Sequence, residues 1–164
     1  MLDMVFDLFT ENDIISLLES IKGKNILPRK IMIGDTNYYN RFPIPENSEY
    51  KQLMEKFLHE KYSRRYLLKD SWINKVTIDT NKDDDYHFDI SNLTIVTYLN
   101  DDFEGGEFEY IDDFESKLRI KPKKNLSLIM NGYLKHRVLP VSKGDRYSLV
   151  SFFDLVKKNK NTLI

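Results

Sequence analysis

Cysteine and alanine are both absent from this sequence of 164 residues, and no hydrophobic run approaches the ~20 residues of a membrane-spanning helix. The lack of cysteine excludes disulfides, thiolate metal sites and a cysteine nucleophile. Any metal must therefore be bound by histidine, aspartate or glutamate. The lack of alanine, together with more lysine than arginine, favours an AT-rich bacterial, phage or viral genome as the source.

Charge of one sign is not in excess either. The chain has 25 basic and 26 acidic residues, a net charge of -1, so the overall positive charge typical of a nucleic-acid-binding protein is missing. The first residues, MLDMVFDLFTENDIISLL, lack the basic flank and uninterrupted apolar stretch of a signal peptide. We therefore expect a cytoplasmic protein with neither a nucleic-acid nor a membrane partner.

The length and the 41% hydrophobic content predict one folded domain that covers residues 1–164. Its first part, to about residue 66, is expected to be helical. A short strand at 4–9 precedes a helix that begins after Thr10, because Thr10 and Asp13 have the spacing of a capping box. Gly23 should end this helix, and apolar residues at helical spacing predict a second helix at 48–62, after an extended stretch at 30–47.

From about residue 70 to 154 the apolar residues alternate, as expected for strands. Eight short segments without intervening helices point to a sandwich or barrel. These segments are 72–80, 86–90, 93–100, 106–111, 116–122, 126–130, 135–141 and 146–153.

Two of the three histidines lie in this strand-rich part. His87 and Asp89 are two residues apart in one segment, so their side chains share a face, and His136 follows in another segment. Two imidazoles and one carboxylate that leave other coordination positions open form the facial triad of non-haem iron(II) oxygenases.

Arg146 and Ser148 share one face of the last segment. A guanidinium inside a barrel is unfavourable unless it meets an anion, and its geometry suits a carboxylate. Ser148 can donate a further hydrogen bond, and Tyr98 on the segment 93–100 can add its phenol. These three residues therefore predict a binding site for a carboxylate-bearing cosubstrate.

In these motifs the sequence resembles the iron(II)- and 2-oxoglutarate-dependent dioxygenases, specifically their prolyl 4-hydroxylase-like branch. The resemblance extends from about Trp72 to Phe153. It rests on YHFDIS, LTIVTYLNDDFEGGEFEYI, KPKKNLSLIM and HRVLPVSKGDRYSLVSFF, which occur in the family's order. It implies a mainly β fold with flanking helices: a double-stranded β-helix, or jelly roll, here with two N-terminal helices.

The resemblance also implies roles for single residues. His87, Asp89 and His136 match the catalytic iron ligands. Arg146 and Tyr98 match the residues that bind the distal carboxylate of 2-oxoglutarate, and Ser148 is a further candidate. The implied cofactors are iron(II), 2-oxoglutarate and dioxygen, with ascorbate as an additional candidate, and the retained aspartate favours hydroxylation of an unactivated C–H bond over halogenation.

The resemblance favours a prolyl residue in a peptide or protein as the substrate. A free amino acid or other small molecule is the alternative substrate, and a catalytically silent module that binds metal or 2-oxoglutarate is the alternative function. A cupin-type metal enzyme without an oxo-acid would leave Arg146 unexplained. The oligomeric state is not indicated. The conceivable substrate contacts, none of them diagnostic, are Tyr38, Tyr39, Arg41, Arg64, Arg65 and Trp72.

Other polar or small residues have simpler interpretations. His59 lies on the second predicted helix without a partner and is expected at the surface. Glu104, Glu107 and Glu109 are expected to be solvated residues at a sheet edge and not metal ligands. Gly105 and Gly106 indicate a tight hairpin and not a phosphate-binding loop, because no helix begins after them.

Overall fold

The computed structural model describes residues 1–24, 40–44, 48–79 and 85–157, which form eleven strands and two helices. Six strands make the main sheet in the order β1-β8-β4-β11-β3-β2, and every neighbouring pair is antiparallel. In chain order these strands are β1 (Leu2–Phe6), β2 (Asn40–Pro43), β3 (Tyr66–Val76), β4 (Leu93–Tyr98), β8 (Leu126–Asn131) and β11 (Arg146–Leu155).

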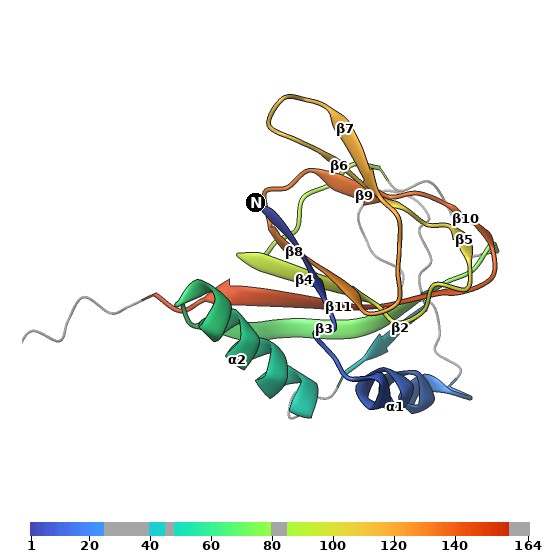
Figure 1. The fold of residues 1–164 in the computed structure, drawn as a ribbon, viewed down its shortest axis with the longest axis horizontal. Coiled ribbons are helices and arrows are strands. Elements are labelled where there is room, and N and C mark those ends of the chain that lie inside the picture. Colours follow the sequence, from blue (N-terminus) through green and yellow to red (C-terminus); the bar gives the residue numbers. More distant parts are fainter. Residues whose placement is uncertain (25–39, 45–47, 80–84, 158–164) are drawn as a thin grey trace, which may run out of the picture.

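Two smaller sheets face one side of the main sheet, and the two helices cover its other side (Figure 1). The smaller sheets have the orders β7-β6-β9 and β10-β5. Their strands are β5 (Glu104–Gly105), β6 (Phe108–Ile111), β7 (Lys117–Ile120), β9 (His136–Val138) and β10 (Val141–Lys143). The opposed antiparallel sheets form a jelly roll, so the expected mainly β fold with two N-terminal helices is confirmed.

The helices begin where their sequences predict. In α1 (Glu11–Ile21), the Thr10 hydroxyl accepts a hydrogen bond from the Asp13 amide at 3.2 Å, and the Asp13 carboxylate accepts one from the Thr10 amide at 2.8 Å. This is the predicted capping box. The second helix, α2 (Glu49–Tyr62), follows Ser48 and ends at Ser63, whose φ of 52° is left-handed. Neither described helix is long and apolar enough to cross a membrane.

Alternating residues of the main sheet form two separate hydrophobic clusters. On the helix side, Ile73, Ile95 and Leu149 pack against helix residues such as Ile14 and Leu58, and all five are at most 1% exposed. Burial of each such side chain stabilises the fold by roughly 1.5–3 kcal/mol. The helices are therefore fixed against the outside of the jelly roll.

The other side of the main sheet faces the interior of the jelly roll. Val96, Leu128 and Val150 lie there, together with Phe108 from β6 in the opposite sheet. Strand β4, which lies in the middle of the main sheet, is buried along its whole length. Polar residues on this same face of the sheet must therefore point into a largely dry space.

Several strand predictions differ from the structure. Residues 86–90 contain a single β-bridge at His87 and no strand. The predicted segment 106–111 contains β6, which pairs with β9, whereas Gly105 belongs to the separate strand β5, which pairs with β10. Strands β5 and β6 do not pair with each other, so Gly105 and Gly106 do not form the predicted hairpin. Strand β2 lies within the stretch predicted to be extended, but it was not identified as a strand, because NRFP has no alternating pattern and is recognisable only by its pairing with β3.

Candidate active site

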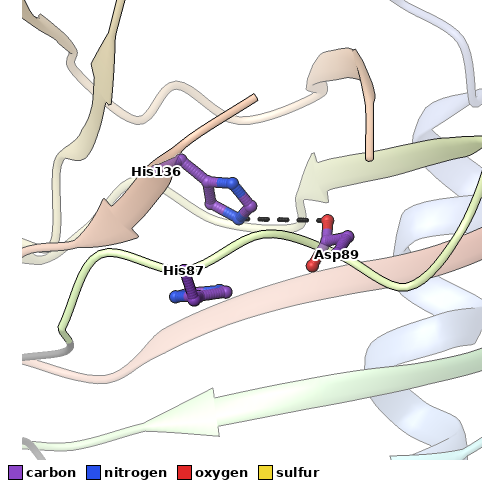
Figure 2. Close-up of side chains that lie close together, drawn as sticks. All are labelled: His87, Asp89 and His136. Atoms are coloured by element: carbon purple, nitrogen blue, oxygen red, sulfur yellow. Dashed lines mark ion pairs between the residues drawn. The ribbon is translucent and has the colours of Figure 1, made fainter. Parts of the chain in front are cut away.

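Three side chains from two distant segments of the jelly roll meet: His87 is exposed, Asp89 is half-buried and His136 is buried. Figure 2 shows His87 and Asp89 on the loop before β4 and His136 at the start of β9. One donor atom from each residue lies within 4.8 Å of the other two, and His136 Nε2 is 3.9 Å from Asp89 Oδ2. The three residues that the sequence singled out are thus close enough to bind one ion.

Each imidazole is oriented by a backbone carbonyl two residues earlier in the chain. His87 Nδ1 is 3.0 Å from the Asp85 oxygen, and His136 Nδ1 is 2.9 Å from the Leu134 oxygen. A ring whose Nδ1 donates to a carbonyl presents the bare lone pair of Nε2, as a metal ligand requires. Burial lowers the pKa of His136, an effect that the nearby Asp89 carboxylate opposes.

The Asp89 carboxylate is held by a short polar chain. Thr94 Oγ1 donates to Asp89 Oδ2 at 2.6 Å, and the Ser91 hydroxyl lies 3.0 Å from Thr94 Oγ1. The Asp89 amide donates to the Gly132 carbonyl at 3.1 Å. These bonds fix the loop against β4 on one side and against the end of β8 on the other.

Gly132 is required for this close approach. A Cβ at this position would lie 2.0 Å from the Ser91 oxygen and 2.8 Å from the Asp89 oxygen, and both atoms are backbone. Backbone atoms cannot move aside as a flexible side chain can, so only glycine allows the Asp89 loop to pack here. Sequence reasoning missed Gly132 because a glycine after a strand usually indicates only a turn.

A second polar group lies on the interior face of β4 and β11. Ser148 is directly opposite Tyr98 in the strand pairing, and the Arg146 guanidinium carbon is 5.1 Å from the centre of the Tyr98 ring. The three residues are between 0% and 2% exposed. Among the described residues, no hydrogen-bond partner exists for Tyr98 Oη, Arg146 Nε or Ser148 Oγ.

Such unpaired buried groups are unfavourable unless a ligand satisfies them. A guanidinium, a phenol and a serine hydroxyl together offer positive charge and several hydrogen-bond donors, which suits a carboxylate. Burial raises the pKa of Tyr98, and Arg146 opposes the shift, so the phenol stays protonated as a donor at neutral pH. The predicted carboxylate-binding residues therefore do lie together.

The backbone beside Arg146 leaves no room for a side chain. A Cβ on Gly106 would lie 2.9 Å from Arg146 Cδ, and one on Gly105 would lie 2.3 Å from the Pro140 oxygen. Both glycines have positive φ angles, 79° for Gly105 and 68° for Gly106. The double glycine thus shapes the wall against which the arginine packs.

Comparison with known proteins agrees with this geometry. Residues 74–154 match the family model described as the 2OG-Fe(II) oxygenase superfamily. The chain belongs to this superfamily. It is therefore a 2-oxoglutarate-dependent dioxygenase. The cofactors expected from the sequence, iron(II), 2-oxoglutarate and dioxygen, are those of the family. The use of ascorbate stays a prediction. No curated protein matches the sequence significantly.

Solved oxygenase structures share the fold over nearly the whole chain. The viral collagen prolyl hydroxylase of Paramecium Bursaria Chlorella virus-1, a 2-oxoglutarate complex, has a TM-score of 0.69 at 19% identity and covers 95% of this chain and 96% of its own. A Pseudomonas putida prolyl-4-hydroxylase has a TM-score of 0.75 at 13% identity, with 95% and 93% covered. A Trichoplax adhaerens prolyl hydroxylase, in complex with a hypoxia-inducible-factor peptide fragment, has 0.72 at 13%, with 93% and 83% covered.

The residues present fit the cofactors of the oxygenase family. Two imidazoles and one carboxylate are the donor set of non-haem iron(II). The unpaired Arg146, Tyr98 and Ser148 fit an acidic cosubstrate. Both groups face the same interior, between the main sheet and strands β6 and β9.

Other residues that the sequence singled out lie elsewhere. His59 and Glu104 are exposed, as expected. Arg64 and Arg65 are exposed after α2, whereas the Arg41 guanidinium carbon lies 4.3 Å from the centre of the Trp72 ring. Tyr38 and Tyr39 fall outside the described residues.

The prediction for Glu109 was wrong. This residue is 1% exposed and accepts hydrogen bonds from Tyr86, Arg119 and Arg137. The alternating pattern of β6 correctly indicated that its side chain points away from the interior. It could not show that side chains from neighbouring segments cover it.

Proposed function

We propose that this oxygenase hydroxylates an unactivated C–H bond, with iron(II) held by His87, Asp89 and His136. The observation that carries the proposal is the meeting of these three donors within 4.8 Å beside an interior that also contains unpaired carboxylate-binding groups. When bound, iron(II) supplies the centre at which dioxygen is activated as 2-oxoglutarate is oxidised to succinate and carbon dioxide.

The roles of the protein residues follow from their environment. Arg146, Tyr98 and Ser148 bind the distal carboxylate of 2-oxoglutarate, because a buried guanidinium and two hydroxyls satisfy it while it neutralises the arginine. The oxo-acid is thereby oriented with its other end toward the histidines. Val96 and Val150, which lie opposite each other on the interior face, exclude water from the space between.

Two assays test the reaction type. Succinate formation from 2-oxoglutarate is measured under air with and without added iron(II), and the same assay is repeated with His136→Ala. Iron-dependent succinate formation that the variant lacks supports the proposal. Binding of manganese(II) and 2-oxoglutarate without any turnover would instead identify a catalytically silent module.

We further propose that the substrate is a prolyl residue in an extended peptide or protein segment. Proline-containing segments are already extended, so binding them loses little chain entropy. Strand β3 offers a suitable surface on the interior side, beside the edge strand β2. There the Trp72 indole Nε1 and the Asn74 amide Oδ1 are buried without a hydrogen-bond partner in the part of the chain that the structure describes.

These two groups match the peptide backbone. The indole N–H of Trp72 can donate to a peptide carbonyl. Two positions further along β3, the amide oxygen of Asn74 can accept from a peptide N–H. Asn74 is directly opposite Ser148, which in turn is opposite Tyr98, so this surface adjoins the carboxylate-binding residues. Among the solved structures with this fold, the Trichoplax prolyl hydroxylase is bound to a peptide fragment.

Mass spectrometry identifies the substrate class. Proline-rich peptides and free amino acids are incubated with the enzyme, iron(II), 2-oxoglutarate and air. A gain of one oxygen atom on a peptide prolyl residue supports the proposal. Oxidation of a free amino acid alone would show that the substrate is a small molecule, while the oxygenase assignment would remain.

A further inference from the structure

Glu109 is a buried carboxylate that the reaction does not use. It lies on β6, the central strand of the sheet β7-β6-β9, and is 1% exposed. Its Oε1 accepts hydrogen bonds from the Tyr86 hydroxyl at 2.5 Å and from Arg137 Nε at 2.7 Å, and its Oε2 accepts one from Arg119 Nε at 2.6 Å. Three side chains from three different segments therefore converge on one carboxylate.

Two of these partners are sequence neighbours of the candidate iron ligands. Tyr86 precedes His87, and Arg137 follows His136. Both bind the same oxygen atom of Glu109. The third partner, Arg119, lies on β7, which contributes no candidate ligand.

The carboxylate lies on the opposite face of the sheet from the ligands. Phe108 and Tyr110 flank Glu109 in β6 and pack toward the interior, where Phe108 stacks on the His136 ring at a centroid distance of 5.1 Å. Since neighbouring residues of a strand point to opposite faces, Glu109 points outward. It can act on the metal site only through the backbone.

We propose that Glu109 is a positioning residue, which holds Tyr86 and Arg137 together so that His87 and His136 keep the separation that one iron ion needs. This inference rests on the proposed function of the two histidines. The segment that contains His87 is held by the backbone bridge to His136, by the bond from the Asp89 amide to Gly132 and by the bond from Thr94 to the Asp89 carboxylate. The hydrogen bond from the Tyr86 hydroxyl to Glu109 ties this segment to β6.

The charges around Glu109 stabilise its ionised, hydrogen-bonded form. Hydrogen bonds from Tyr86 and from the two arginines lower the pKa of Glu109 to about 2, although burial alone would raise it. The Arg137 guanidinium carbon also lies 4.7 Å from the centre of the Tyr86 ring, so these two partners of Glu109 contact each other directly. The carboxylate thus stays ionised at neutral pH, and its loss would leave two arginines without their shared anion.

The test measures metal binding by the full chain, independently of turnover. Manganese(II) is titrated and free ion is followed by electron paramagnetic resonance, while the absorption bands of the cobalt(II) protein report ligand geometry. We expect Tyr86→Phe and Glu109→Ala to weaken manganese affinity by about tenfold, as for other residues that orient metal ligands, and to alter the cobalt spectrum. Glu109→Gln, which keeps an acceptor oxygen, should restore part of the affinity.

Arg119→Gln is the matched control. It removes a bond to Oε2 of the carboxylate, whereas Tyr86 and Arg137 bind Oε1. It should therefore leave metal affinity and the cobalt spectrum unchanged even if it lowers the melting temperature. Unchanged manganese affinity in Tyr86→Phe would overturn the proposal. This substitution removes only one hydroxyl, so it remains informative if Glu109→Ala does not fold. Failure of the unsubstituted protein to bind manganese or cobalt would overturn the proposed function itself.

Discussion

The main chains of His87 and His136 are hydrogen-bonded to each other in both directions, at 2.9 Å from the His87 amide and 3.0 Å from the His136 amide. This bridge joins residues that are far apart in the sequence and leaves their rings with a centroid distance of 4.5 Å. Asp89, two residues after His87, completes the group. The backbone bridge therefore brings the two imidazole rings together without a metal.

His136→Ala should abolish 2-oxoglutarate turnover, because it removes one of three donors and leaves a site with one imidazole and one carboxylate. The fold should persist, since the backbone bridge needs no side chain. Succinate formation and circular dichroism measure the two effects. His59→Ala is the control, because His59 is exposed on α2, and equal activity in both variants would contradict the assignment.

Arg146→Ala should weaken 2-oxoglutarate binding by on the order of a hundredfold, which is about 3 kcal/mol, the loss expected when one partner of a buried charge pair is removed. Calorimetry on the manganese-substituted protein measures this affinity without turnover. Arg64→Ala removes an exposed arginine after α2 and should leave the affinity unchanged. If Arg146→Ala binds as tightly as the unsubstituted protein, the carboxylate is bound elsewhere.

Most of the architecture could be predicted because it follows from local patterns. The capping box at Thr10 and Asp13 determines the start of α1, and alternation in β4 and β11 places Tyr98 and Ser148 on one face. The spacing of His87 and Asp89 similarly implies that they share a direction. Each of these predictions needs only residues that are close in the sequence.

What the sequence could not show depends on contacts between distant segments. Glu109 is buried because Tyr86, Arg119 and Arg137 approach it from three segments, which no alternating pattern encodes. Gly132 matters because of a loop some forty positions earlier in the chain that passes within contact distance of it. In both cases the relevant property belongs to the assembled fold.

Gly132→Ala should displace the Asp89 loop, since the new Cβ would overlap two backbone oxygens. Overpacking of this kind typically costs 1–3 kcal/mol, and we expect about 3 kcal/mol because neither oxygen can move alone. Metal affinity should fall together with the melting temperature. Gly23→Ala is the comparison: no atom of the described residues lies within 4 Å of its Cβ position, so its positive φ of 72° is what opposes alanine there. A loss of stability without a change in manganese affinity would show that the loop adapts.

Removal of metal should lower the melting temperature of the protein. A ligand that binds only the folded state at a hundred times its dissociation constant stabilises that state by about 2.7 kcal/mol, which for a chain of this length corresponds to roughly 5–10 °C. Differential scanning calorimetry with manganese(II) and with a chelator measures the difference. His136→Ala should show no such dependence, and an equal shift in that variant would indicate that the ion binds elsewhere.

Acid should destabilise the protein through Glu109 in a defined range of pH. The pKa of its carboxyl is lowered by the Tyr86 and arginine hydrogen bonds from the ordinary value of 4.5 to about 2 in the folded state. Because the unfolded chain takes up the proton first, the contribution of Glu109 to stability is complete above pH 4.5 and is lost progressively as the pH falls toward 2.

Urea denaturation at a series of pH values measures how steeply the stability falls. Glu109→Gln has no carboxyl to titrate at this position, so its stability should fall less steeply in the same range, whereas Glu104→Gln, which alters an exposed residue paired with Lys143, should keep the slope of the unsubstituted protein. Parallel curves for the unsubstituted protein and Glu109→Gln would show that the buried carboxylate does not govern acid stability.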